Sequence, residues 1–216
     1  MADAPAEPPL GGGASAPHAG QRPTPHIRVT APAGLPRVPA GQVVAPHWPV
    51  LHHGEVPDGP SPWRLRLFGA VAVERELALD DLRRTASVEI EADVHCVSGW
   101  SLLDNRWVGV PFAQAEALAV PRPEARFLMA HAAGGWSTNL SLADCRRTGV
   151  ALVFARNGQP LPTAHGGPLR LLVPHMYFWK SCKWLVGLEW MAEDRPGFWE
   201  RDTKYHDLDP WHGYRA

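Results

Sequence analysis

The sequence predicts a mixed α+β domain that is rich in strands and has only short helices. Several runs alternate apolar and polar residues with a period of two, which is typical of half-buried strands. Helical signals are confined to three short runs. Hydrophobic residues make up 45% of the 216 residues, which is enough for a sizeable core.

Strands are expected in the runs 63–71, 87–96, 125–132, 168–174 and 183–191. Asn157-Gly158 lies between apolar runs, so a hairpin is expected over 150–161. In the run 87–96, the period of two gives one face the residues Val88, Ile90, Ala92, Val94 and Cys96. The other face carries Glu89, Glu91, Asp93 and His95. This pattern places Cys96 on the inward side, at the end of the strand.

Short helices are expected over 77–84, 111–120 and 141–149. Pro111 stands in the first turn of the second helix, where a missing N–H costs nothing. In the third helix, Ser141 is the expected N-cap, Asp144 follows three residues later, and Gly149 is the expected terminator.

The N-terminal composition predicts two further segments. Residues 1–62 hold fourteen of the 23 prolines and eight of the 20 glycines. Residues 1–38 have no pattern that could bury apolar surface, so we expect a disordered tail. Residues 39–62 carry Val, Trp and Leu between prolines and are expected to form an extended arm lying on the domain. One domain is therefore expected over 39–216, including this arm.

Charge and cysteine usage narrow the class of protein. A net charge of −1 gives no overall basic footprint, so we expect no nucleic-acid partner. No apolar run is long enough to span a bilayer, and no export signal is visible. Three separate cysteines do not form a disulfide framework. We expect a soluble, cytoplasmic protein, and we interpret its ten tryptophans as an aromatic core.

Cys96 is the first candidate for chemistry. A thiolate at the end of a buried strand could act as a nucleophile or a soft metal ligand, whereas a buried thiol could simply fill space. His95 points to the opposite face, which argues against a Cys–His pair. A structural zinc site is not expected, because the cysteines are isolated and no C-x-x-C is present.

A second candidate is the basic segment 165–184. It gathers His165, Arg170, His175, Lys180 and Lys183 around Gly166-Gly167, whose small size would permit close approach to a ligand. Ser181 and the surrounding N–H groups could bind phosphate oxygens. The segment is either an anion pocket or a strand pair with a solvated basic loop.

Four stretches resemble one known family: VHCVSGWSLLDNRWVGVPF, STNLSLADC, HGGPLRLLVPHMYFWKSCKWL and EDRPGFWERDTKYHDLDPW. They are similar to the sulfite-oxidase-like molybdopterin-binding oxidoreductase family in its short bacterial form. The upstream PAGQVVAPHWPVLHHG also resembles the segment that leads into the domain in that family. The resemblance runs in consistent order over 39–211. It implies a sulfite-oxidase-type molybdopterin-binding fold and a molybdenum-molybdopterin cofactor.

The resemblance also implies roles for individual residues. Cys96 matches the cysteine that ligates molybdenum, and His165 and Arg170 match residues that bind the pterin and its phosphate. The S-x-K turn of the family corresponds to Ser181, Cys182 and Lys183. Further cofactor contacts are expected from His52 and His53 on the arm and from His131 at a strand end.

The implied activity is oxygen-atom transfer to or from a small-molecule substrate, with an unidentified electron donor or acceptor. Sulfite oxidases carry arginines directly after the metal cysteine, whereas Val97, Ser98, Gly99 and Trp100 stand here. Sulfite is therefore not the expected substrate. The alternative is a non-catalytic molybdopterin-binding or storage protein. A structural domain without cofactor is disfavoured by the presence of Cys96, Arg170 and Lys183.

Overall fold

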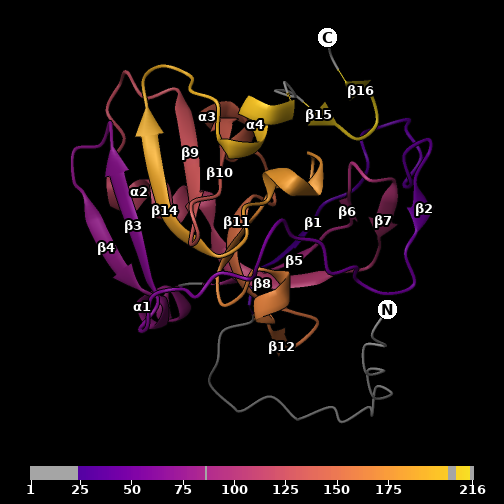
Figure 1. Ribbon diagram of the computed structural model, residues 1–216, viewed down its shortest axis with the longest axis horizontal. Helices are drawn as coiled ribbons and strands as arrows, with labels where there is room; N and C mark the ends of the chain where they lie inside the picture. The colour runs from indigo at the N-terminus through magenta and orange to yellow at the C-terminus, as the bar shows by residue number, and fades with distance from the viewer. Residues whose placement is uncertain (1–23, 86, 204–207, 215–216) are drawn as a thin grey trace.

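Two large sheets make up most of the protein in the computed structural model, which describes residues 24–85, 87–203 and 208–214 (Figure 1). The five-stranded sheet has the order β10 (Ser137–Ser141), β9 (Phe127–Ala132), β14 (Leu185–Met191), β3 (Arg64–Gly69) and β4 (Arg75–Ala78). The six-stranded sheet has the order β1 (His26–Arg28), β5 (Val88–Glu91), β8 (Arg106–Pro111), β11 (Ala151–Arg156) and β12 (Gln159–Pro160), with β13 (Arg170–Leu172) paired to β11.

Smaller elements complete the fold. A three-stranded sheet has the order β2 (Val43–Val44), β7 (Trp100–Leu102) and β6 (Val94–His95), and β15 (Leu208–Asp209) pairs with β16 (Gly213–Tyr214). The helices are α1 (Leu79–Arg84), α2 (Phe112–Ala119), α3 (Leu142–Cys145) and α4 (Phe198–Thr203), with 3₁₀ turns η1 (Thr163–His165) and η2 (Phe178–Lys180). The predicted mixed, strand-rich fold with short helices is confirmed. None of the described helices could cross a membrane.

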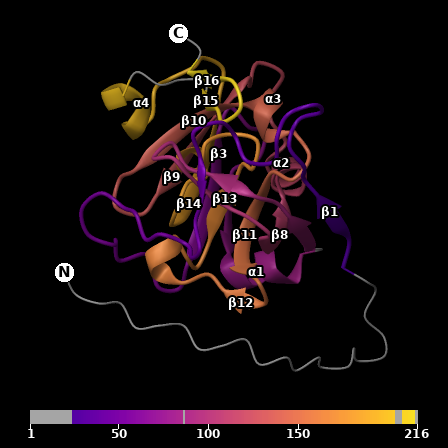
Figure 2. The ribbon, with the colours of Figure 1, turned by 90° about the vertical axis from the view of Figure 1, so that its right-hand side faces the viewer.

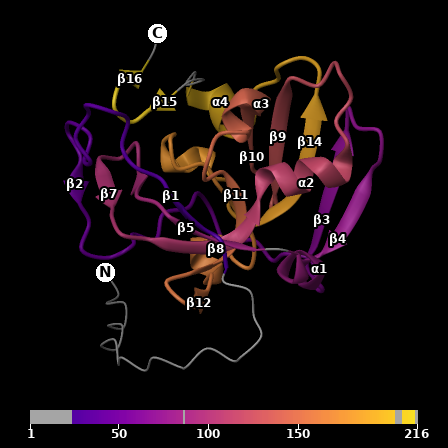
Figure 3. The ribbon, with the colours of Figure 1, turned by 180° about the vertical axis from the view of Figure 1, so that it is seen from behind.

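The six-stranded sheet buries both of its faces in the middle. Leu152 of β11 and Leu171 of β13 belong to the apolar cluster shared with the five-stranded sheet. Val153 and Leu172, their neighbours in sequence, point the other way into a second cluster with Trp107. Figure 3 shows α2 lying across the back of the molecule, where Phe112 and Ala115 join the first cluster. A strand buried on both faces has no polar face, which explains the short apolar runs ALV and LL.

The turn and the helix start predicted from local sequence are both present in the structure. Asn157 and Gly158 both have positive φ and connect β11 to β12 as predicted. Ser141 Oγ accepts a hydrogen bond from Asp144 N at 3.0 Å, as expected of an N-cap. The helix is shorter than predicted, however, because α3 ends at Cys145 instead of continuing to Gly149.

The predicted strand 87–96 is not continuous. At Ala92 the chain leaves the six-stranded sheet, and the Ala92 carbonyl accepts hydrogen bonds from the Asn105 amide and the Trp107 indole. The residues after this break join a different sheet as β6. His95 was therefore wrongly predicted on the outward face: it is 1% exposed, and its ring lies 4.8 Å from that of Trp211.

The predicted tail 1–38 also requires correction. Residues 1–23 lie outside the described residues, but β1 pairs in parallel with β5 (Figure 2). Val29 N donates to Glu91 O at 2.8 Å, and Arg37 forms an ion pair with Asp93 at 2.6 Å. Backbone pairing requires little apolar surface of its own, so composition alone did not indicate this strand.

A truncation series tests the contribution of this segment. Deletion of residues 1–38 removes β1 and Arg37 and is expected to lower the free energy of unfolding by about 1–3 kcal/mol, since hydrogen bonds contribute about 0.5–1.5 kcal/mol each. Deletion of residues 1–23 leaves all of these contacts in place and serves as the control. The measurement is urea denaturation, and equal stability of the two truncated chains would contradict the prediction.

Candidate functional site

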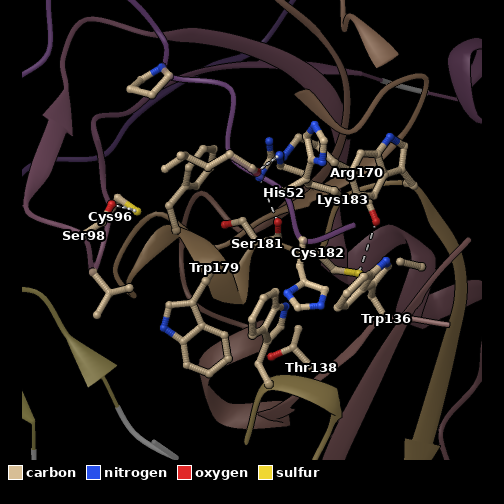
Figure 4. Close-up of a pocket in the computed structure, with 18 of the residues that line it drawn as sticks. His52, Cys96, Ser98, Trp136, Thr138, Arg170, Trp179, Ser181, Cys182 and Lys183 are labelled. Atoms are coloured by element: carbon tan, nitrogen blue, oxygen red, sulfur yellow. Dashed lines mark hydrogen bonds between the residues drawn. The ribbon is translucent and has the colours of Figure 1, made fainter. Parts of the chain in front are cut away.

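A cavity of about 460 Å³ lies between the arm, the turn after β6, the segment 178–184 and α4 (Figure 4). Its volume falls within the range of small-molecule and cofactor pockets. It gathers seven of the nine site residues predicted from the sequence: His52, His53, Cys96, Arg170, Ser181, Cys182 and Lys183. Figure 4 shows Cys96 and Ser98 on one side of the cavity and Arg170 and Lys183 on the other.

Cys96 begins a tight hairpin turn between β6 and β7. Its N–H donates to Trp100 O at 2.8 Å, and Gly99 N donates to Cys96 O at 3.0 Å. Gly99 has φ +89°, the left-handed conformation that closes a three-residue hairpin loop and that glycine adopts without strain. The half-exposed thiol of Cys96 lines the cavity, with Sγ 3.1 Å from Ser98 Oγ.

Arg170 is a fully buried cation whose charge has no acidic partner among the described residues. It is 1% exposed and donates to two main-chain carbonyls, His165 O at 2.7 Å and Ser181 O at 2.8 Å. Its guanidinium lies 4.2 Å from the ring centre of Phe178, and within the described chain its Nε has no hydrogen-bond partner. Burial lowers the pKa of Arg170 to about 9, which still leaves it charged at neutral pH.

Lys183 repeats this pattern beside Arg170. Its Nζ donates to Leu51 O at 2.5 Å and to Ala164 O at 3.4 Å, both main-chain carbonyls. Burial, reinforced by the positive charge of Arg170, lowers the pKa of Lys183 to about 8. Buried charges in proteins are normally paired with opposite charges. Neither cation has a carboxylate partner among the described residues, and the burial of Arg170 argues against a fully solvated basic loop. The arrangement has the charge that an anion would need.

His165 lies next to the cavity and is not part of its lining. Its ring stacks on Trp48 with ring centres 4.0 Å apart, and Nδ1 is buried without a hydrogen-bond partner in the described part of the chain. Burial, together with the charges of Lys183 and Arg170, lowers the pKa of His165 to about 4. The ring is therefore neutral at neutral pH.

The two glycines of this segment approach the protein itself. A side chain at Gly166 would meet Lys183 Cβ at 2.6 Å, and one at Gly167 would meet Leu161 O at 2.0 Å. The prediction that these glycines make room for a ligand is therefore wrong, because the space beside them is taken by Lys183 and Leu161. The small size of the glycines lets η1 pack closely against Lys183.

The remaining predicted residues differ in their surroundings. Ser181 is buried, and its hydroxyl accepts from Val173 N at 2.9 Å. Cys182 lines the cavity, but burial raises the pKa of its thiol to about 12. His52 and His53 are exposed on the arm. His131 lies outside this cavity, where its Nε2 is 2.9 Å from Glu189 Oε2.

Aromatic residues that the sequence analysis did not single out form much of the wall. Six of the ten tryptophans line the cavity, so the interpretation of the tryptophans as an aromatic core holds only in part; they are Trp48, Trp100, Trp136, Trp179, Trp184 and Trp199. Trp136 stacks on Trp199 with ring centres 5.5 Å apart. The high tryptophan count was the one available signal, but it does not distinguish a core from a pocket.

Helix α4, which carries Trp199, is fixed to η2 by a buried ion pair, and hydrogen bonds join this pair to β10. Lys180 Nζ lies 2.6 Å from Glu200 Oε1, and the two side chains are 1% and 0% exposed. Lys180 also donates to Asn139 O at 2.8 Å, and Thr138 Oγ1 donates to Glu200 Oε1 at 2.5 Å. Lys180, predicted as part of the basic segment, is therefore neutralised and positions the cavity wall.

A second cavity, of about 480 Å³, provides a contrast. It lies around His95 and is lined by Arg28, Arg37, Arg146 and Arg147. Each of these arginines has a carboxylate partner: Glu91, Asp93, Glu116 and Asp144 respectively. Its cations are already compensated, unlike those of the first cavity.

The comparisons with a family model and with known proteins agree with one another on the family. The model of the oxidoreductase molybdopterin-binding domain matches residues 53–199. The uncharacterized oxidoreductase YuiH of Bacillus subtilis is 42% identical over 181 residues, which cover 83% of this chain and 91% of that protein. The protein-methionine-sulfoxide reductase catalytic subunit MsrP of Ralstonia nicotianae is 29% identical over 156 residues, 65% of this chain and 47% of that protein.

The fold has a counterpart among solved structures. The sulfane dehydrogenase SoxCD from Paracoccus pantotrophus matches with a TM-score of 0.64 and 22% identity. The match covers 76% of this chain and 48% of the SoxCD chain. The chain thus spans about half the length of MsrP and of the SoxCD chain, and nearly the whole length of YuiH.

The buried pair beneath α4 gives a stability prediction. Lys180→Met leaves Glu200 buried without its partner and is expected to lower the free energy of unfolding by about 3–5 kcal/mol. The double variant Lys180→Met/Glu200→Leu should recover most of that loss. Arg66→Met, which breaks an exposed pair with Glu74, is the control and should cost less than about 1 kcal/mol. Denaturant unfolding measures all three variants, and equal losses for Lys180→Met and Arg66→Met would contradict the prediction.

The lowered pKa of Lys183 gives a pH prediction. An anion beside Lys183 favours its charged form, so binding above pH 8 requires proton uptake by a group whose pKa is about 8 in the free protein. Affinity of the cofactor-free protein for sulfate, whose own charge does not change over this range, should therefore be nearly flat between pH 6 and 7, and should fall above pH 8 by up to about tenfold per pH unit.

Calorimetric titration in buffers of different ionisation enthalpy measures both affinity and proton uptake. Lys183→Met should bind more weakly at pH 7 and show a smaller fall between pH 8 and 9, where Arg170, with a pKa of about 9, still titrates. The control Arg147→Met, at a cation that faces Asp144, should match the parent chain. A parent chain whose affinity does not change up to pH 9 would show that Lys183 does not contact the anion.

Proposed function

We propose that this chain, which belongs to the family of oxidoreductase molybdopterin-binding domains, transfers an oxygen atom to or from a small substrate at a molybdenum ion held by Cys96. As a member of this family it is a molybdenum-molybdopterin-dependent oxidoreductase. The observation that carries the proposal is one cavity that combines an accessible thiol with a buried Arg170 and a half-buried Lys183, neither of which has a carboxylate partner among the described residues.

Cys96 is the cysteine best suited to hold the metal. A metal ligand must be a thiolate that the metal can reach. Burial raises the pKa of Cys145 well above its usual value and that of Cys182 to about 12, so both remain neutral thiols. Cys96 is half-exposed, faces the cavity and lies on a turn held by its own backbone hydrogen bonds.

Arg170 and Lys183 fit the phosphate of the pterin. Both residues line a cavity in which no described carboxylate pairs with either cation, and within the described chain the Nε of Arg170 lacks an acceptor. A phosphate oxygen is the acceptor that a buried guanidinium prefers, and it would also compensate both charges. Ser181, whose hydroxyl already accepts from Val173 N, retains a proton to donate.

The chain divides the remaining tasks among its elements. When bound, the cofactor supplies a metal that can exchange an oxo group while changing oxidation state by two electrons. The turn after β6 presents the thiol, the arm covers the cavity with Trp48, and Trp136 and Trp199 form an apolar wall that excludes water. The proposal includes an electron donor or acceptor, because the metal must be restored after each turnover.

The surroundings of Cys96 support an uncharged substrate. Val97, Ser98 and Trp100 follow it and line the cavity, and none of them is charged. A sulfite or similar anion would need cations there, and the two available cations lie on the other side of the cavity (Figure 4). A neutral organic oxide needs only apolar contact and a hydrogen-bond donor such as Ser98. The relative MsrP carries the name of a methionine-sulfoxide reductase, which agrees with such a substrate.

Cys96→Ser tests the proposal. A hydroxyl remains protonated and is a poor ligand, so the variant should lose most of its molybdenum and all of its redox activity. Cys182→Ala is the control, because it removes a buried neutral thiol from the same cavity and should retain the metal. Elemental analysis and pterin fluorescence, on protein from a host that makes molybdopterin, give the readouts. Wild-type protein with zinc and no molybdenum would refute the proposal, and a loaded chain without turnover on any small oxide would favour a storage protein.

A further inference from the structure

We infer that Gln42, on the arm, is a positioning residue that fixes the orientation of Cys96 toward the metal. Its amide Nε2 donates to the main-chain carbonyl of Cys96 at 2.9 Å. The inference rests on the proposed role of Cys96 as the metal ligand. Gln42 lies upstream of residues 53–199, so it falls outside the part of the chain that the family model covers.

The carbonyl of Cys96 accepts two hydrogen bonds from different parts of the chain. One comes from Gly99 N within the turn at 3.0 Å, and the other comes from Gln42 at 2.9 Å. A carbonyl oxygen has two lone pairs, so this acceptor is saturated. Because the carbonyl carbon and Cβ are both bonded to Cα, fixing the peptide plane also fixes the Cα–Cβ direction from which Sγ extends.

Gln42 is itself held by a buried chain of hydrogen bonds. Ser101 Oγ donates to Gln42 Oε1 at 3.3 Å and is bonded to His95 Nδ1 at 2.8 Å. Ser101 has one hydroxyl proton, which it gives to Gln42, so His95 Nδ1 is the donor to Ser101. His95 and Ser101 are 1% and 0% exposed. The chain therefore leads from the protein interior to the residue proposed to bind the metal.

The backbone of the arm grips the same turn. Val43 N donates to Gly99 O at 2.9 Å, and Ala45 N donates to Ser101 O at 2.8 Å. These bonds set the register of β2 against β7, in which Val43 pairs with Trp100. Gln42, one residue before this pair, lies beside the turn and reaches the Cys96 carbonyl. The main-chain bonds would persist in a Gln42 variant, so the side chain can be tested without detaching the arm.

The two possible roles of Gln42 predict different measurements. If it only fastens the arm, its loss lowers stability and leaves the metal centre unchanged. If it positions Cys96, its loss alters the geometry of the metal–thiolate bond in a protein that remains fully loaded. Contacts outside the ligands themselves are known to tune metal centres in this way. The Mo(V) electron paramagnetic resonance spectrum reports that geometry and is insensitive to stability.

The experiment compares holo-protein of the parent chain, Gln42→Leu, Gln42→Glu and the control Gln159→Leu, which makes the same Gln-to-Leu change at an exposed position on β12. Gln42→Glu keeps an acceptor for Ser101 but replaces the donor to Cys96 with a carboxylate oxygen. Both Gln42 variants should contain as much molybdenum and pterin as the parent and should show shifted g-values with a broader signal. The control should match the parent spectrum.

The outcomes separate this inference from the proposed function. Unchanged spectra in loaded Gln42 variants would overturn the inference alone. Absence of molybdenum from the parent chain would overturn the proposed function and this inference together. If Gln42→Leu does not fold, Gln42→Glu decides the question, because it preserves the size of the side chain and its bond to Ser101.

Discussion

The arrangement of the cavity depends on one buried guanidinium. Arg170 comes from a strand that is buried on both faces, and it donates to carbonyls of two separate segments, His165 and Ser181. Trp48 of the arm lies over the same group, with its ring centre 5.5 Å away, and Phe178 lies closer still. One side chain thus links the arm, η1 and the segment that carries Ser181 and Lys183. Loss of Arg170 would leave both carbonyls without this donor, so the side chain stabilises the mutual positions of these segments.

Holding Arg170 and Lys183 without a carboxylate partner among the described residues costs electrostatic free energy. Lys180, the other buried lysine or arginine among the described residues, faces the carboxylate of Glu200. Arg170 and Lys183 donate to main-chain carbonyls instead; burial lowers the pKa values of both, and the charge of Arg170 further lowers that of Lys183. A bound phosphate would reverse that effect and add charge-assisted hydrogen bonds. The cofactor-free protein is accordingly predisposed toward an anionic ligand, which agrees with the family to which it belongs.

The thiol and the cations are positioned by different means. The cations are set by burial within the six-stranded sheet and the segment that follows it. Cys96 lies outside that core, on a hairpin of the small three-stranded sheet, whose third strand is supplied by the arm. A two-residue strand such as β2 has little stability of its own, so side-chain bonds such as that of Gln42 add to its hold on the turn. The position of the turn that carries Cys96 therefore depends on the arm, which lies almost wholly upstream of the residues 53–199 that the family model matches.

The sequence by itself determined the features that are local. The N-cap at Ser141, the hairpin at Asn157-Gly158 and the strand-rich fold class follow from spacing and turn chemistry. Family resemblance singled out Cys96, Arg170 and Lys183, and all three line one cavity. The tertiary structure decided what depends on distant partners. The break at Ala92 turns His95 inward, β1 orders part of the predicted tail, and Glu189 holds His131 away from the cavity. Only the fold shows that Lys180 is neutralised whereas Lys183 is not, because a lysine's partner is selected by three-dimensional packing and leaves no trace in the adjacent residues.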